Sequence, residues 1–211
     1  MSQPFNDAVM KIQNLGFLAS GQGSNMQAII DACNEGRLNA HAVVVISNNG
    51  NSGALDRAES EGIPAHHLGS NNFPDADKRD QIIADTLRNY DVGLVVLAGY
   101  MKKIGAKTLA AYPGRIINIH PALLPKFGGK EMYGKHIHAA VLASGETETG
   151  ITIHVVDAQY DTGPILAQAK VPVEKGDTVE SLAERVLVVE HRFYVETLCK
   201  ILSGEIVLPQ A

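Results

Sequence analysis

Two polar residues at the end of an apolar run carry the strongest chemical signal in this sequence. The segment 115–125, RIINIHPALLP, sets Asn118 and His120 two residues apart, directly after a pair of isoleucines. Alternate residues of a strand face the same side of a sheet, so we expect this amide and this imidazole to point into one space. Pro121 then ends the strand, because proline has no N–H for a sheet ladder. Either residue alone is typical of a hydrogen-bonded core, whereas the pair at a strand end indicates catalysis.

An aspartate loop, DAQYDTGP at 157–164, is the second candidate. Aspartates in loops are most often turn residues, and that remains one interpretation of Asp157 and Asp161. The loop follows an expected strand at 151–156, which we expect to end beside the strand that carries His120. Asp161 would then reach the imidazole and favour its charged form.

A glycine-rich loop, SGQGSN at 20–25, joins an expected strand to an expected helix. Free N–H groups and the dipole at a helix N-terminus favour an anion, and Gly21 and Gly23 would let the backbone approach it closely. The third glycine of a dinucleotide fingerprint is absent, as is the lysine of a Walker A loop. A single phosphate therefore fits this loop best. Ser24 and Gln27 have the spacing of a capping box for the helix.

No other set of residues points to a metal or to a nucleophile. His154 lies inside an expected strand and is interpreted as a structural hydrogen-bonding residue. The histidines, cysteines and acidic residues lack the spacing of metal ligands, so no metal site is predicted. There is no GxSxG elbow.

Glu190 lies on the last expected helix, at the margin of its apolar stripe. It is either a helix-edge charge or a substrate contact, and the pattern leaves both open.

Composition and charge narrow the class of protein. The chain has 211 residues, 45% of them hydrophobic and 19% charged, which suits one globular domain over 1–211. A net charge of −5 argues against a nucleic-acid surface. Residues 1–14 lack the layout of a signal peptide and are expected to form a short flexible extension. No apolar run is long enough for a membrane span. Cys33 and Cys199 form no CxxC pair, and a cytoplasmic location is predicted.

Strand and helix patterns alternate along the chain. Strands are expected at 15–19, 42–46, 63–68, 92–98, up to His120, 151–156 and 165–171. Helices are expected at about 26–33, 54–61, 77–90, 105–111, 137–143 and 178–203. The alternation predicts an α/β fold with an open, mostly parallel, doubly wound sheet, in which ligands bind at the carboxyl ends of the strands. The segment 126–135 is expected to be a mobile loop.

Five segments together resemble the phosphoribosylglycinamide formyltransferases, a folate-dependent formyltransferase family. They are SGQGSNMQAII, VVLAGYMKKI, RIINIHPALLPKF, ITIHVVDAQYDTGPILAQAKVPV and ERVLVVEH, and they run in the family's order from about residue 15 to residue 206. NIHP…LLP followed by D-x-x-x-D-x-G-P is specific for the wider folate formyltransferase group. GSN and the EH of the last helix favour the ribonucleotide branch. The resemblance implies a Rossmann-like formyltransferase fold.

The resemblance also implies site residues, motif by motif. The catalytic trio would be Asn118, His120 and Asp161. The ribonucleotide would be bound through its phosphate by Gly23, Ser24 and Asn25, and elsewhere by Glu190. The folate slot would be lined by Met101, Lys102, Lys103, Ile104, Asp157 and Asp161. This chain departs from the family pattern at Lys102, which replaces an arginine, in the longer loop after LLPKF, and near Asp75 to Arg79, where no arginine aligns with the expected folate contact.

The resemblance implies that the chain transfers the formyl group of 10-formyltetrahydrofolate, used as co-substrate, to the amine of N1-(5-phosphoribosyl)glycinamide in de novo purine biosynthesis. Its partners would be small molecules, with no nucleic acid, membrane or metal, and it would be a monomer or a homodimer. Three alternatives remain. A methionyl-tRNA formyltransferase has an added C-terminal domain, and a formyltetrahydrofolate hydrolase has an N-terminal regulatory domain. A non-catalytic nucleotide-binding module would not need Asn118, His120 and Asp161 together.

Overall fold

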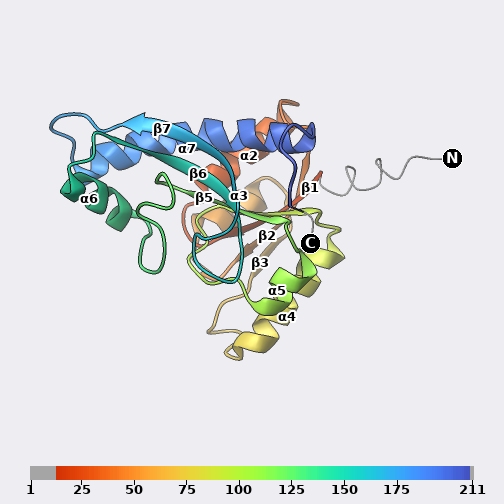
Figure 1. The fold of residues 1–211 in the computed structure, drawn as a ribbon. Helices are drawn as coiled ribbons and strands as arrows, with labels where there is room; N and C mark the ends of the chain where they lie inside the picture. Colours follow the sequence, from red (N-terminus) through yellow and green to blue (C-terminus); the bar gives the residue numbers. More distant parts are fainter. Residues whose placement is uncertain (1–12, 210–211) are drawn as a thin grey trace.

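A single seven-stranded sheet runs through the computed structural model, which describes residues 13–209 (Figure 1). The strands are β1 (Asn14–Ala19), β2 (His41–Ser47), β3 (Ala65–His67), β4 (Leu94–Leu97), β5 (Ile116–His120), β6 (Glu148–Val155) and β7 (Ile165–Pro172). The helices of this part of the chain are α2 (Ser24–Asn34), α3 (Gly53–Ser60), α4 (Ala76–Asn89), α5 (Ala106–Ala111), α6 (Lys135–Ser144) and α7 (Val179–Leu202).

The sheet has the order β3-β2-β1-β4-β5-β6-β7, and the first five strands in the chain are parallel. β6 and β7 complete it as antiparallel strands. The chain starts in the middle of the sheet and builds outward in both directions, so β1 and β4 form the switch point at which such folds bind ligands. The prediction of an open, mostly parallel, doubly wound α/β sheet is confirmed.

Alternation along the strands supplies two separate apolar cores, one on each face of the sheet. On β1, Phe17 belongs to the core under α2, α3, α6 and α7, whereas Leu18 belongs to the core under α4 and α5. Both side chains are fully buried. Figure 1 shows α2 and α7 above the sheet and α4 and α5 below it. Because both faces are covered, the central strands are almost wholly apolar.

The N-terminal end differs from expectation in one detail. Residues 1–12 of the predicted flexible extension lie outside the described residues. Gln13 and Asn14 do not belong to such an extension, because the Gln13 carbonyl accepts a hydrogen bond from the His41 N–H and Asn14 begins β1. Backbone pairing with β2 fixes these two residues in the sheet.

The N-termini of α2 and α7 are capped differently. Gly23 precedes α2 in the left-handed conformation, with φ of 72°, and no side chain caps the helix. The predicted capping box of Ser24 and Gln27 is therefore wrong, since Ser24 is already the first helical residue. α7 begins with a true capping box, in which the side chains of Thr178 and Ser181 each accept the other's backbone N–H.

The corner that follows β5 is held in place by the neighbouring strands. The Thr152 hydroxyl on β6 donates to the Ala122 carbonyl at 2.7 Å and accepts from the Leu124 N–H at 3.0 Å. Gln168 on β7 donates to the Leu124 carbonyl at 3.0 Å. These contacts fix the direction in which the chain leaves His120.

Within residues 13–209, no helix is long and apolar enough to cross a membrane.

Candidate active site

One cavity of about 440 Å³ brings together most of the predicted site residues. Its lining includes Asn25, Met101, Lys102, Lys103, Ile104, Asn118, His120, Asp157, Asp161 and Glu190. These residues come from α2, α7, β5 and the loops that follow β4 and β6. Gly23 and Ser24 do not line the cavity. They lie at the start of α2, directly before Asn25, which does.

The route by which Asp161 reaches the site differs from the prediction. β6 is antiparallel to β5, with His120 opposite Thr152 and Ile117 opposite Val155. The carboxyl end of β6 therefore lies beside the amino end of β5, not beside His120. The loop 157–164 returns along the strand and brings Asp161 to the imidazole. The predicted proximity is confirmed, but the expectation of two adjacent carboxyl ends is wrong.

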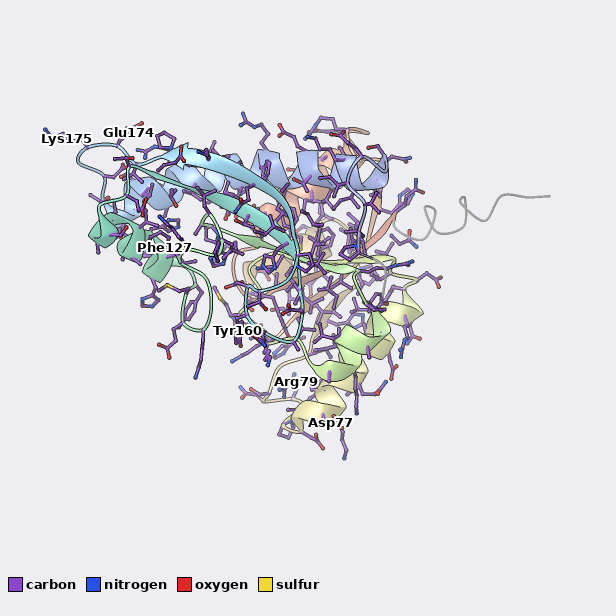
Figure 2. The ribbon with its side chains drawn as sticks, viewed as in Figure 1. Asp77, Arg79, Phe127, Tyr160, Glu174 and Lys175 are labelled. Atoms are coloured by element: carbon purple, nitrogen blue, oxygen red, sulfur yellow. The ribbon has the colours of Figure 1, made fainter. Side chains whose placement is uncertain are left out.

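Asp161 lies between two buried histidines. Its Oδ2 is 3.6 Å from His120 Nδ1, and its Oδ1 is 3.5 Å from His154 Nε2. The side chains of His120 and His154 are 5% and 3% exposed. The Gly129 N–H donates to Asp161 Oδ2 at 2.9 Å, which ties the loop after β5 to the carboxylate. Phe127 and Tyr160, labelled in Figure 2, mark the two loops that meet here.

Backbone carbonyls fix where the protons of these imidazoles sit. His120 Nε2 lies 2.8 Å from the Phe127 carbonyl, and His154 Nδ1 lies 3.0 Å from the Val155 carbonyl. A carbonyl only accepts, so each of these nitrogens carries the proton. The remaining nitrogen of each ring faces Asp161. His154 Nε2 also lies 3.2 Å from the Asn118 side-chain nitrogen. That nitrogen has two protons, so at least one is left for a ligand.

Burial decides the charge of His120 in the ligand-free protein. Desolvation lowers the pKa of His120, and Asp161 and the Phe127 carbonyl only partly offset that effect. The expectation that Asp161 holds His120 charged is therefore not met here, because the carboxylate lies beyond hydrogen-bond distance of Nδ1. Burial raises the pKa of Asp161, but His154, His120 and the Gly129 N–H outweigh it, so the net shift is downward. Asp161 therefore favours the carboxylate form, and His120 favours the neutral imidazole.

His154 is predicted from the sequence to be a structural hydrogen-bonding residue and is not among the predicted site residues. Its hydrogen bonds are observed, but it also lines the cavity. The structure puts it in the cavity lining, opposite Asn118 in the β5–β6 pair and in contact with Asp161. A signal for this was present. In ITIHVV, Thr152 and His154 share one face of the strand while two isoleucines occupy the other. Two buried polar residues on one face need partners, and such partners gather at sites.

A second polar pair, Asn25 and Glu190, lines the same cavity. The Asn25 amide donates to Glu190 Oε2 at 2.8 Å, so the α2 N-terminus and α7 meet there. Asn25 Oδ1 is buried and has no partner among the described residues. Glu190 is 7% exposed, and desolvation raises its pKa to about 7 despite the Asn25 hydrogen bond. The helix-edge interpretation of Glu190 is excluded, because the carboxyl is buried and faces the cavity.

Replacing Glu190 by Gln should stabilise the ligand-free protein in alkaline solution. The folded-state pKa of about 7 exceeds the unfolded value of 4.5, so the stability gained from protonating Glu190 is present at low pH and lost as pH rises through about 7. Above that pH the buried carboxylate costs about 3 kcal/mol. We expect Glu190→Gln to raise the melting temperature at pH 8.5 and leave it unchanged at pH 4.5. Glu196→Gln, an exposed change on the same helix, is the control. Equal melting temperatures at pH 8.5 would contradict the assignment.

The open side of the cavity is apolar and cationic. Met101, Tyr133 and Tyr160 are 53%, 51% and 44% exposed although they line it, and Ile104 is buried. Lys102, Lys103 and Lys130 add positive charge to the same lining. This combination suits a flat ring system with an anionic tail. Asp157 lines the cavity too, but its carboxylate accepts from the Gln159 N–H at 2.8 Å and from Thr162, so it also forms a turn.

The segment 75–79 lies apart from the main cavity. Asp75 caps α4 by accepting the N–H groups of Asp77 and Lys78. Arg79 donates to the Phe73 carbonyl at 2.5 Å and is absent from the cavity lining. Figure 2 shows Asp77 and Arg79 at the start of α4.

No group of three or more potential metal ligands occurs within residues 13–209.

Comparison with known proteins agrees with this geometry. The family model described as formyl transferase matches residues 13–198. The chain belongs to the formyl transferase family. It is 36% identical to the phosphoribosylglycinamide formyltransferase of Bacillus subtilis over 192 residues, covering 91% of this chain and 96% of that protein.

Two further matches, one to a plant protein and one to a solved structure, agree with this family assignment. The chain is 44% identical over 192 residues to the chloroplastic phosphoribosylglycinamide formyltransferase of Arabidopsis thaliana, covering 88% of this chain. It spans only 64% of that plant relative. The crystal structure of glycinamide ribonucleotide transformylase 1 from Symbiobacterium toebii superposes with a TM-score of 0.87 at 41% identity, covering 94% of this chain and 92% of that one. The formyltransferase fold implied by the motifs is thus confirmed.

Proposed function

We propose that this chain transfers the formyl group of 10-formyltetrahydrofolate to the amine of N1-(5-phosphoribosyl)glycinamide, as a step of purine biosynthesis. The relatives' names support the reaction. The observation that carries it is the cavity, whose lining combines Asp161 and two imidazoles with the Asn25–Glu190 pair and an exposed apolar rim. The ribonucleotide would bind at the Asn25–Glu190 pair and the folate at the rim.

The donors of the site suit an oxyanion. When the amine attacks the formyl carbon, the carbonyl oxygen gains negative charge, and donors already in place stabilise it. The free amide proton of Asn118 is one such donor. His120 is the second, but its Nε2–H is engaged by the Phe127 carbonyl in the ligand-free protein. Turning that donor to the substrate requires the 126–129 segment to move.

Asp161 would assist the transfer of the amine proton to the departing folate nitrogen. The attacking amine must lose a proton, and the departing N10 of the folate must gain one. A carboxylate with a low pKa between two imidazoles can stabilise a transient imidazolium without leaving the charge unpaired. The C–N bond to the amine forms first and gives the oxyanion. The carbonyl then re-forms as the C–N10 bond breaks, so no covalent bond to the protein is needed.

The proposal is tested by supplying both substrates to the purified protein and following tetrahydrofolate release together with the mass of the formylated ribonucleotide. We expect one formylated product for each tetrahydrofolate, and no release without the amine. Release of formate and tetrahydrofolate at the same rate without the amine would identify a hydrolase. Binding without turnover would favour the non-catalytic module.

The location, assembly and extent of the unit are also part of the proposal. We propose that the chain acts as one formyltransferase domain on small molecules only, as a monomer or homodimer in the cytoplasm. The net charge of −5 supports the absence of a nucleic-acid partner.

The loop 126–135 should become ordered when both ligands bind. It contains four residues with positive φ, Phe127, Gly129, Glu131 and Gly134. None of its residues is fully buried, although Phe127 and Met132 pack against the core. Such segments open at low free energy cost. We expect its amide hydrogen exchange to slow at least about tenfold with both ligands present, while exchange in α4 stays unchanged. Identical exchange in the loop with and without ligands would show that it is already rigid.

A further inference from the structure

Arg57, on α3, reaches the backbone of the glycine loop. Its Nε donates to the Gln22 carbonyl at 2.8 Å, and its Nη1 lies 3.4 Å from the Gln27 side-chain oxygen on α2. The Ala54 N–H, on the same helix, donates to the Gly21 carbonyl at 3.1 Å. Two successive carbonyls of the loop are therefore tied to α3.

These two bonds determine where the loop's N–H groups point. In a trans peptide the carbonyl and the following N–H lie on opposite sides. Because the Gly21 and Gln22 carbonyls face α3, the N–H groups of Gln22 and Gly23 face away from it. Gly23 is the N-cap residue directly before α2, and its carbonyl accepts the Gln27 N–H at 2.9 Å. None of residues 13–209 accepts a hydrogen bond from the N–H groups of residues 22–25. Successive free N–H groups of this kind bind anions.

Gly23 packs tightly against α3. A side chain on Gly23 would meet the Ala54 backbone at 2.9 Å, so the loop and α3 are in direct contact. Asn25, next in the chain, lines the cavity with a buried oxygen that has no partner in the described part. A polar ligand in the cavity could supply the partner that this oxygen lacks.

The charge of Arg57 is available to that ligand. Within the described residues no carboxylate forms an ion pair with Arg57. The nearby carboxylates of Asp31 and Glu61 are instead bonded to the Gln27 amide nitrogen, at 2.8 Å and 2.9 Å. His191 on α7 experiences the same cation. Burial lowers the pKa of His191, and the Arg57 charge lowers it further.

We propose that Arg57 is a positioning residue for the phosphate of the ribonucleotide. It fixes the Gln22 carbonyl, which aims the N–H groups of Gln22 and Gly23 at the phosphate, and its unpaired charge attracts the dianion. This role rests on the proposed function, since it assumes that a phosphorylated substrate binds at the glycine loop. It assigns specificity for the phosphate to a helix outside the cavity lining.

Steady-state kinetics of Arg57→Ala test the proposal. We expect the KM for the ribonucleotide to rise about tenfold or more, since hydrogen bonds to charged groups are the strong ones. The folate KM and kcat should stay within about twofold. Arg57→Lys should recover part of the loss at low salt through charge alone. Arg88→Ala, which removes an exposed arginine from α4, is the control. Unchanged ribonucleotide KM, or an equal loss in kcat, would overturn the proposal.

A dephosphorylated substrate separates positioning from general damage. The riboside analogue of the substrate should be used equally poorly by the natural protein and by Arg57→Ala, because neither gains from the phosphate. A further loss in the variant would mean that Arg57 only supports the fold. Inorganic phosphate gives a test independent of the reaction. It should shift the amide resonances of Gln22 and Gly23 in the natural protein, with about tenfold weaker binding in Arg57→Ala. Equal phosphate affinities would refute the role even if the protein transfers no formyl group.

Discussion

Asp161→Asn should lower kcat by about a hundredfold or more while both substrate KM values change little. The side chain keeps its shape, and the amide oxygen can still accept the Gly129 N–H. Asparagine also tolerates the left-handed backbone at this position, where φ is 57°. What is lost is the negative charge between His120 and His154. Desolvation already lowers the pKa of His120, and without the carboxylate it should fall further. The acidic limb of the pH–rate profile should then move to lower pH.

Asp91→Asn is the matched control for this change. Asp91 is also an aspartate with positive φ, of 50°, but it is exposed and lies at the end of α4. The two variants therefore share the change in charge and the left-handed backbone conformation. They differ in that Asp161 lines the cavity and Asp91 does not. We expect Asp91→Asn to keep the natural kcat. If Asp161→Asn also keeps it, Asp161 is only a turn residue and the proton must be transferred elsewhere.

Gly23→Ala should raise the KM for the ribonucleotide by about tenfold or more, with little change in folate binding. Gly23 has φ of 72°, and an added Cβ would lie 2.9 Å from the Ala54 backbone. Left-handed backbone costs a residue other than glycine about 1–2 kcal/mol, and the clash must in addition displace the loop from α3. Displacement would turn the loop N–H groups away from the phosphate. Steady-state kinetics with each substrate varied in turn measure the effect.

Gly36→Ala separates the backbone strain from the clash. Gly36 has φ of 71°, but no atom lies within 4 Å of the position its Cβ would take. This variant should lose only the strain contribution, about 1–2 kcal/mol of the free energy of unfolding, and keep the natural KM. A normal ribonucleotide KM in Gly23→Ala would place the phosphate away from this loop.

The sequence by itself determined the sheet and much of the site. Apolar runs such as 92–98 predict buried parallel strands, and the proline after His120 marks where β5 ends. These features are local, because they depend on residue periodicity and on backbone chemistry within a few positions. The pairing of Asn118 with His120 was visible for the same reason. The glycines at 21 and 23 likewise predict an anion-binding loop from local backbone chemistry alone.

The tertiary structure alone decided what surrounds those residues. The direction of β6 places Asp161 by a return loop and brings His154 opposite Asn118, and strand direction depends on pairing between segments far apart in the chain. The low pKa of His120 and the raised pKa of Glu190 follow from burial, which no local pattern specifies. Arg57 became a candidate only through contact with Gln22, 35 residues away. Periodicity identifies the elements, but the charges and hydrogen bonds of a site depend on how distant elements pack together.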